Sequence, residues 1–308
     1  MRALHVPAAG EKPQIGVVPV PAVASGEVLI RVRAAALNPI DGAIAAGVLA
    51  GMLPHSYPVV LGRDAAGIVE AAGPGVTHVV PGDEVFGHIP LTPPIQAGTL
   101  AEYVVLPAAT VVVKPAGLTF TQAAALPLAA AAASQAVDAI GARAGQTVLV
   151  NGASGGVGSF AVQLLAARGA TVIATGADVA RLTALGATLV VDRAAGPVAD
   201  QVLAAHPSGV DALINLFGRT DEDVPLAALR PSAPIATLAQ APAPGAGRPI
   251  HKIMATPLRE ITAPLALQAA AGTLTVDVVT VIPLDQATDA LTTITTGHAR
   301  GKTVVTFP

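Results

Sequence analysis

The stretch VLVNGASGGVGSF, residues 148–160, decides how this chain is expected to fold. Three apolar residues lead into glycines at 152, 155 and 158, and an alanine-rich amphipathic run follows. Glycine lets the backbone come close to a pyrophosphate, and the N-terminus of a following helix offers backbone donors and partial positive charge. A glycine-rich turn alone could be purely structural. Between a predicted strand and a predicted helix, this spacing favours a dinucleotide-binding turn.

Strand and helix patterns alternate on both sides of this turn. Helices are expected between the strands, for example at 156–168 and 178–185, and further helices at about 257–271 and 285–296. Residues 240–250 are expected to form a Pro/Gly-rich loop. The predicted strands are 147–151, 171–175, 188–192, 211–216 and 234–239. This alternation predicts an α/β fold with a doubly wound parallel sheet of the Rossmann type.

The first third of the chain is β-rich by its pattern. In residues 27–35, Val28, Ile30 and Val32 alternate with Leu29 and the arginines, which is typical of a strand with one solvated face. Short apolar runs separated by Gly and Pro continue to about residue 113. They predict a small barrel-like or sandwich domain. A helical, alanine-rich stretch broken at Pro127 follows.

Composition excludes several classes of function. Of 308 residues, 52% are hydrophobic and 12% charged, and the net charge is −3, so no basic field suggests nucleic acid or an anionic membrane. The absence of cysteine excludes disulfides, thiolate nucleophiles and cysteine-based zinc sites. Polar residues interrupt the longest charge-free stretches, 115–137 and 144–167. We therefore expect no membrane span, no signal peptide and a cytoplasmic protein.

The second strand of the α/β region suggests which dinucleotide binds. It ends at Ala174-Thr175-Gly176, which is small and neutral, whereas an acidic residue there would favour NAD. A 2′-phosphate has room, and Arg181 and Arg193 could pair with it, although Asp178 would repel it. The alternative is that both arginines are ordinary surface residues. NADP(H) is the expected cofactor.

Several motifs in order resemble the zinc-independent quinone oxidoreductases of the medium-chain dehydrogenase/reductase superfamily. They are ALNPIDG (36–42), YPVVLGRDAAGIVEAAGPGV (57–76), PGDEVFG (81–87), GTLAEYVVLP (98–107), AAALPLA (123–129), GQTVLVNGASGGVGSFAVQLLAARGATVIAT (145–175), LGATLVVD (185–192) and GHARGKTVV (297–305). The resemblance implies a GroES-like catalytic domain of residues 1–120 and 260–308 and a Rossmann domain of residues 121–259.

The same resemblance suggests a reaction without zinc. Zinc-dependent relatives carry Gly-His-Glu where this chain has Gly62-Arg63-Asp64, and they use a cysteine ligand that is absent here. The histidines show no ligand-like spacing. The implied reaction is hydride transfer from NADPH to a quinone or an α,β-unsaturated carbonyl.

Site residues follow from the motifs by resemblance. Asn38 and Asp41 match positions at the nicotinamide end of the site, where both are expected to be catalytic; the alternatives are a turn residue before Pro39 and a helix cap. Lys302 and Arg300 could approach the cofactor or be solvated surface charges. The expected cofactor-binding residues are Asn38, Ser154, Gly155, Gly156, Val157, Thr175, Arg181, Arg193, Asn215, Phe217, Leu238 and Gln240.

The substrate half departs from the family pattern. Ala43 and Ser134 stand where relatives often have aromatic residues, and Ala132 stands where they have a hydroxyl. An alternative is therefore an NADP(H)-binding, redox-responsive protein with little or no turnover. The expected partner is a small apolar carbonyl or quinone, with no nucleic acid and no membrane, and a homodimer is possible.

Overall fold

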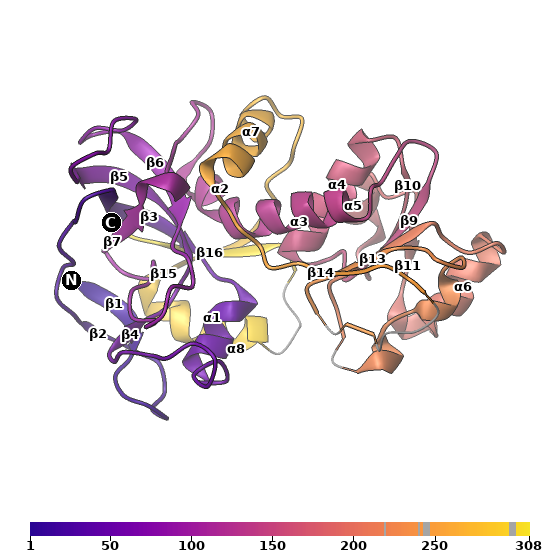
Figure 1. Cartoon of the computed structure of the whole chain (residues 1–308), viewed down its shortest axis with the longest axis horizontal. Helices are drawn as coiled ribbons and strands as arrows, with labels where there is room; N and C mark the ends of the chain where they lie inside the picture. Colours follow the sequence, from indigo (N-terminus) through magenta and orange to yellow (C-terminus); the bar gives the residue numbers. More distant parts are fainter. Residues whose placement is uncertain (219, 240, 243–246, 296–299) are drawn as a thin grey trace. The chain divides into compact units, whose positions relative to one another are not determined.

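The computed structural model describes residues 1–218, 220–239, 241–242, 247–295 and 300–308. The chain forms two compact units, Met1–Leu128 with Thr256–Pro308 (unit 1) and Ala129–Ala255 (unit 2). The colours of Figure 1 show that unit 1 contains both the indigo N-terminal and the yellow C-terminal segments. The domain limits 120/121 and 259/260 stay predictions.

Unit 1 is mainly β-structure, as the first third of the sequence predicts. In its described part, the larger sheet has the order β15-β16-β3-β5-β6-β8 with β7 also paired to β3, and the smaller sheet has the order β2-β1-β4. The strands are β1 (Arg2–Val6), β2 (Gln14–Val17), β3 (Glu27–Ala36), β4 (Val59–Val60), β5 (Asp64–Ala72), β6 (Glu84–His88), β7 (Tyr103–Pro107), β8 (Val112–Val113), β15 (Val278–Pro283) and β16 (Lys302–Thr306).

Strand β3 organises the larger sheet. Its alternation is confirmed, because Val28, Ile30 and Val32 are buried while Leu29 and Arg31 are partly exposed. Strand β16 runs antiparallel to β3, and the Leu37 N–H donates to the Thr303 carbonyl at 3.0 Å. This register brings the start of the last strand to the residues that follow β3.

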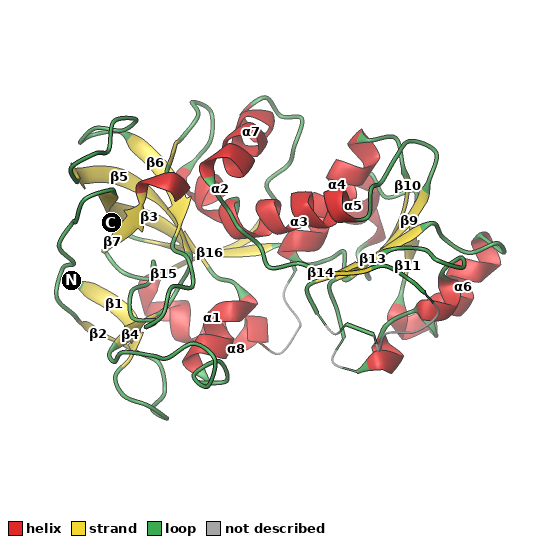
Figure 2. Cartoon of the chain, in the orientation of Figure 1, coloured by secondary structure: helices red, strands yellow, loops and turns green. Residues whose placement is uncertain are grey.

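The helices of unit 1 include one that directly follows the segment after β3. They are α1 (Pro39–Ala45), α2 (Phe120–Ala125), α7 (Arg259–Ala270) and α8 (Ala287–Thr295), while α3 (Pro127–Ala139) begins here and continues into unit 2. Helices α1 and α8 lie side by side (Figure 2). A Cβ atom on Gly42 would lie 1.9 Å from Thr295 Cγ2, so a side chain there would have to displace the methyl group of the exposed Thr295. The predicted break at Pro127 is confirmed.

Unit 2 contains a parallel sheet with the order β11-β10-β9-β12-β13-β14. Strand β9 lies in its middle, and Leu149, Ile173, Leu213 and Ile235 form part of a buried core. The strands are β9 (Thr147–Asn151), β10 (Thr171–Thr175), β11 (Leu189–Val191), β12 (Ala212–Asn215), β13 (Ile235–Thr237) and β14 (Ile250–Lys252). The predicted doubly wound α/β fold is confirmed.

One prediction for unit 2 is wrong at its edge. Residue 250 was expected in a loop, but Ile250–Lys252 forms β14 and pairs in parallel with β13. A strand of three residues is too short to show a hydrophobic period, and the preceding Pro/Gly-rich residues suggest a loop.

The helices that lie wholly in unit 2 are α4 (Gly156–Ala167), α5 (Val179–Ala184) and α6 (Val198–Ala205). Within the described ranges, every helix is too short or too polar to cross a membrane.

Candidate active site

The glycine-rich turn connects β9 to α4 in unit 2. Gly152 has a φ of +93°, which favours glycine. A Cβ atom on Gly158 would lie 2.4 Å from the Gly152 carbonyl oxygen and 2.5 Å from Ala153 Cα. Both neighbours are backbone atoms that cannot move aside. These two glycines are therefore required by the turn itself.

Gly155 is different, because the turn does not need it sterically. It lies at the N-cap of α4 with a φ of −80°, and a Cβ atom there would have only the Gly152 carbonyl oxygen, at 3.7 Å, within ordinary contact distance. The absence of a side chain leaves the backbone donors at the start of α4, including Gly156 and Val157, open to close approach. A pyrophosphate fits this cradle, which a methyl group would partly fill.

Polar side chains connect the carboxyl ends of four neighbouring strands of unit 2. Thr175 of β10 donates to Asn151 Oδ1 of β9 at 3.3 Å, and Asn151 Nδ2 donates to Asn215 Oδ1 of β12 at 2.8 Å. Asn215 Nδ2 in turn lies 3.5 Å from Thr237 Oγ1 of β13. Thr175 Oγ1 also accepts from the Gly152 N–H at 2.7 Å. This row of buried side chains ties the turn to the sheet edge where doubly wound folds bind ligands.

Both predicted phosphate-binding arginines lie near this edge. Arg193 Nη2 donates to Thr175 Oγ1 at 3.1 Å, and its guanidinium carbon lies 3.5 Å from the centre of the Phe217 ring. Partial burial lowers the pKa of Arg193, opposed by the carboxylates of Asp223 and Asp192. The structure therefore gives Arg193 specific contacts that an ordinary surface arginine lacks.

Arg181 reaches the turn from α5. Its Nη2 donates to the Ser154 carbonyl oxygen at 3.3 Å, and Asp178 caps α5 by accepting from the Arg181 backbone N–H at 3.1 Å. Leu238, just after β13, is exposed. Gln240 lies outside the described residues. Whether these residues bind a cofactor stays a prediction.

In unit 1, Asn38 and Asp41 begin α1. Asn38 is the N-cap, and its backbone N–H donates to Asp41 Oδ2 at 2.8 Å. The alternative that Asp41 is the helix N-cap is not met as such, because Asn38 is the N-cap and Asp41 is its capping-box partner three residues later. Both side chains are buried, which an ordinary cap does not require.

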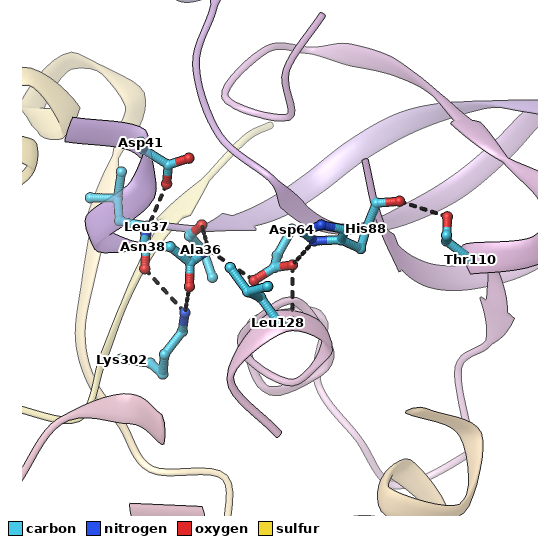
Figure 3. A network of polar contacts seen from close by, with 9 residues as sticks. All are labelled: Ala36, Leu37, Asn38, Asp41, Asp64, His88, Thr110, Leu128 and Lys302. Carbon is cyan, nitrogen blue, oxygen red and sulfur yellow. Dashed lines mark hydrogen bonds and ion pairs between the residues drawn. The ribbon is translucent and has the colours of Figure 1, made fainter. Parts of the chain in front are cut away.

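The side chain of Asn38 connects two buried charged residues (Figure 3). Its Nδ2 donates to Asp64 Oδ2 at 2.9 Å and to the Ala36 carbonyl oxygen at 3.3 Å. Its Oδ1 accepts from Lys302 Nζ at 2.6 Å, and Lys302 also donates to the Leu37 carbonyl oxygen at 3.1 Å. The alternative of a solvated surface charge is wrong for Lys302, because β16 carries it into the interior, where it is 4% exposed.

Asp64 is the common acceptor of this cluster. Besides Asn38, its Oδ1 accepts from His88 Nδ1 at 2.8 Å and from the Leu128 N–H at 3.2 Å (Figure 3). The His88 carbonyl oxygen in turn accepts from the Thr110 hydroxyl at 2.6 Å. Neither His88 nor Thr110 belongs to a motif that sequence reasoning singled out for the site.

Four buried charged groups face one another here. Burial raises the pKa of Asp41 to about 7, although Arg63 and Lys302 act in the opposite direction. Burial lowers the pKa of Lys302 and of Arg63, against the attraction of Asp64 and Asp41. Arg63 Nη2 donates to the Ala97 carbonyl oxygen at 2.5 Å. We call Asn38, Asp41, Arg63, Asp64, His88 and Lys302 the buried charge cluster.

Comparisons with known proteins find family matches to sequence segments in both units. Residues 24–116 match the alcohol dehydrogenase GroES-like domain, and residues 185–305 match the zinc-binding dehydrogenase family. The chain is 31% identical to an NADPH-dependent alkenal/one oxidoreductase of Arabidopsis thaliana chloroplasts, covering 93% of this chain and 73% of that one. The solved structure of a quinone oxidoreductase from Coxiella burnetii is 30% identical, with a TM-score of 0.86 and coverage of 100% and 99%.

The chain therefore belongs to the medium-chain dehydrogenase/reductase superfamily, and its relatives there include quinone and enone oxidoreductases. Its GroES-like and Rossmann parts are those of that fold. A mitochondrial NAD(P)H oxidoreductase of Homo sapiens is 38% identical over 65% of this chain. That match spans 54% of the human protein, about half of its length.

Zinc, which the name of one matching family implies, does not fit the buried charge cluster. In the described part of the chain, no group of three or more His, Cys, Asp or Glu residues could hold a metal ion. Both oxygens of Asp64 are engaged by donors, and two buried cations lie close by. A divalent cation would have to displace those donors and would be repelled by Arg63 and Lys302.

Proposed function

We propose that the chain is an NADPH-dependent, zinc-free oxidoreductase that transfers a hydride to a quinone or an α,β-unsaturated carbonyl. The observation that carries this proposal is the contrast within the turn: Gly152 and Gly158 are needed for the backbone, whereas Gly155 is needed only if something approaches the backbone closely. Two relatives, an NADPH-dependent alkenal/one oxidoreductase and a quinone oxidoreductase, support the proposed substrate class.

The chain's own residues would hold the cofactor in an order set by the sheet edge. Residues 154–157 would hold the pyrophosphate, and Thr175, Arg181 and Arg193 would surround the 2′-phosphate. Asn215, Phe217 and Leu238, and separately Asn38 and Asp41, are the residues that would contact the nicotinamide half of the cofactor. When bound, the reduced nicotinamide supplies the hydride. The protein would orient the reactants and stabilise the developing negative charge.

The first experiment is a titration of the wild-type chain with NADPH and with NADH. Replacing Arg193→Ala should weaken NADPH binding by about 1.5–3 kcal/mol, because a charge-assisted phosphate contact is lost, and should leave NADH binding almost unchanged. Arg143→Ala, at an exposed arginine of unit 2, is the matched control. Equal, weak binding of NADPH and NADH by the wild type would contradict the 2′-phosphate assignment.

Turnover separates the enzyme from a binding protein. NADPH oxidation with any member of a panel of quinones and enones should occur and should persist after treatment with a chelator. Tight NADPH binding without oxidation across the panel would instead favour a redox-responsive binding protein, which the small side chains at Ala43, Ala132 and Ser134 motivate. A homodimer and a cytoplasmic location stay predictions, which sedimentation and cell fractionation would test.

A further inference from the structure

The guanidinium of Arg193 has two partners within unit 2 and still reaches solvent. Its carbon lies 3.5 Å from the centre of the Phe217 ring, and its Nη2 donates to Thr175 Oγ1 at 3.1 Å. Arginine has five N–H donors, all in the plane of the guanidinium, whereas an aromatic ring covers only a face of that plane. Since Arg193 is exposed, stacking on Phe217 leaves N–H groups at its edges available to a ligand.

Both partners of Arg193 are themselves anchored to Asn151 at the end of β9. The buried Thr175 hydroxyl donates to Asn151 Oδ1 and accepts from the Gly152 N–H. Phe217 lies in the segment after β12, and Asn151 Nδ2 holds the backbone of that segment. This nitrogen lies 3.5 Å from the Phe217 carbonyl oxygen and donates to the Asp223 carbonyl oxygen at 3.3 Å. The ring and the hydroxyl are therefore both tied to the same side chain.

The segment after β12 is also tightly folded. Gly218 has a φ of +117°, and a Cβ atom there would lie 2.6 Å from Asp223 Cβ, so the turn favours glycine. The Asp223 carboxylate attracts the Arg193 guanidinium. One segment thus provides Arg193 with an aromatic face and a negative charge, and the end of β10 provides a hydroxyl.

We propose that Phe217 is a positioning residue for a 2′-phosphate: its ring holds the Arg193 guanidinium at the end of β10, where the guanidinium can pair with the phosphate. A free arginine side chain loses rotational freedom when it binds, and an arginine that is already stacked loses less. This inference rests on the proposed function, because it takes the 2′-phosphate of NADPH as the ligand of Arg193. All of the residues involved belong to unit 2.

This role is separate from a contact between Phe217 and the nicotinamide half of the cofactor, because the guanidinium covers only one face of the ring. The test therefore uses two ligands without nicotinamide, 2′,5′-ADP and 5′-AMP, which differ only in the 2′-phosphate. Phe217→Leu should weaken 2′,5′-ADP binding about three- to tenfold, the effect of a lost cation–π contact, and should leave 5′-AMP binding unchanged. Isothermal titration calorimetry would measure both.

Phe217→Tyr is the matched control, because it keeps the ring and should keep the wild-type ratio of the two affinities. A loss of structure would weaken both ligands, so only this ratio reports positioning. If Phe217→Leu does not fold, Phe217→Met, which also replaces the ring by an apolar chain, is measured by the same criterion. A ratio that falls equally in Phe217→Tyr and in the ring-deleting variant would overturn the role of the ring.

A double variant tests whether Phe217 acts through Arg193. In an Arg193→Ala background, Phe217→Leu should weaken 2′,5′-ADP binding no further, because the guanidinium that the ring holds is gone. A further loss as large as in the wild-type background would contradict action through Arg193.

The remaining outcomes separate the two proposals. A wild type that binds 2′,5′-ADP no better than 5′-AMP removes the 2′-phosphate from the proposed function, and the role of Phe217 with it. A wild type that prefers 2′,5′-ADP, together with a folded Phe217→Leu variant of equal preference, overturns the positioning role alone.

Discussion

The glycine turn of unit 2 and the buried charge cluster of unit 1 are built in opposite ways. The turn works by leaving side chains out, so that backbone donors at the start of α4 stay accessible. The cluster works by filling the interior with charged side chains whose hydrogen bonds fix one another. At Gly158 the turn has no room for an added atom, whereas the cluster depends on each of its charged partners.

The difference shows where each part is vulnerable. A buried charge is stable only when its partners compensate for its loss of hydration. Removing one partner therefore leaves the remaining charges with an uncompensated desolvation penalty. At Gly158 of the turn, by contrast, an added side chain would overlap backbone atoms. Variants of the two regions should therefore respond differently to pH, to added volume and to lost hydroxyl groups.

The largest effect is expected for the pH dependence of Asp41. An unfolded aspartate titrates near 3.8, whereas buried Asp41 titrates at about 7, so between these values the folded chain keeps a proton that the unfolded chain has lost. The free energy of unfolding should therefore fall as pH rises from about 4 to about 7, by about 2–4 kcal/mol, and level off above that. Urea midpoints measured across this range would show it.

Asp41→Asn removes this titration but keeps an oxygen that can accept from the Asn38 N–H. Its urea midpoint should lose this part of the pH dependence, whereas Asp289→Asn, at an exposed aspartate of unit 1, should keep it. The same slope in Asp41→Asn and wild type would show that another group carries the dependence.

The next largest effect is expected within the glycine turn. Gly158→Ala places a methyl group against two backbone atoms and should destabilise unit 2 by about 1–3 kcal/mol. Gly155→Ala meets no such overlap and should cost about 1 kcal/mol or less, yet it should weaken NADPH binding more than its effect on stability explains. Thermal unfolding and NADPH titration of both variants separate the two roles. Wild-type NADPH affinity in Gly155→Ala would place the pyrophosphate elsewhere.

A smaller effect is expected for the hydroxyl that ties the turn to β10. Thr175→Val keeps the volume but leaves the Gly152 N–H without its acceptor, which should cost about 1–2 kcal/mol. Thr175→Ser keeps the hydroxyl and loses only a methyl group, at about 0.8 kcal/mol. If serine proves more damaging than valine in chemical denaturation, packing rather than hydrogen bonding fixes the turn.

The sequence predicted the turn well because its signal is local. Strand β9, the glycines and α4 are contiguous in the sequence. The spacing of the glycines marks Gly152 and Gly158, the two positions where the turn has no room for a side chain or needs a positive φ. Strand β14 was missed because three residues carry no period, and only pairing with β13 defines it.

The buried charge cluster could be predicted only in part. Motif resemblance pointed to Asn38 and Asp41, but their burial and their links to Lys302 depend on pairing between β3 and β16, over 260 residues apart in the sequence. His88 carried no signal, since a lone histidine at the end of a short strand resembles many others. Lys302 is buried because β16 pairs with β3, and the residues around Lys302 in the sequence do not reveal that pairing.

The composition of unit 1 from both ends of the chain has a consequence for biosynthesis. On the ribosome, Asn38, Asp41 and Asp64 emerge early, whereas Lys302 follows after all of unit 2 has been made. Until β16 is complete, the early carboxylates have no lysine partner and β3 lacks one neighbour. Chains interrupted before residue 302 would thus leave a sheet edge exposed, a feature that chaperones and proteases recognise. The buried charge cluster can close only after β16 has been made, because β16 supplies Lys302.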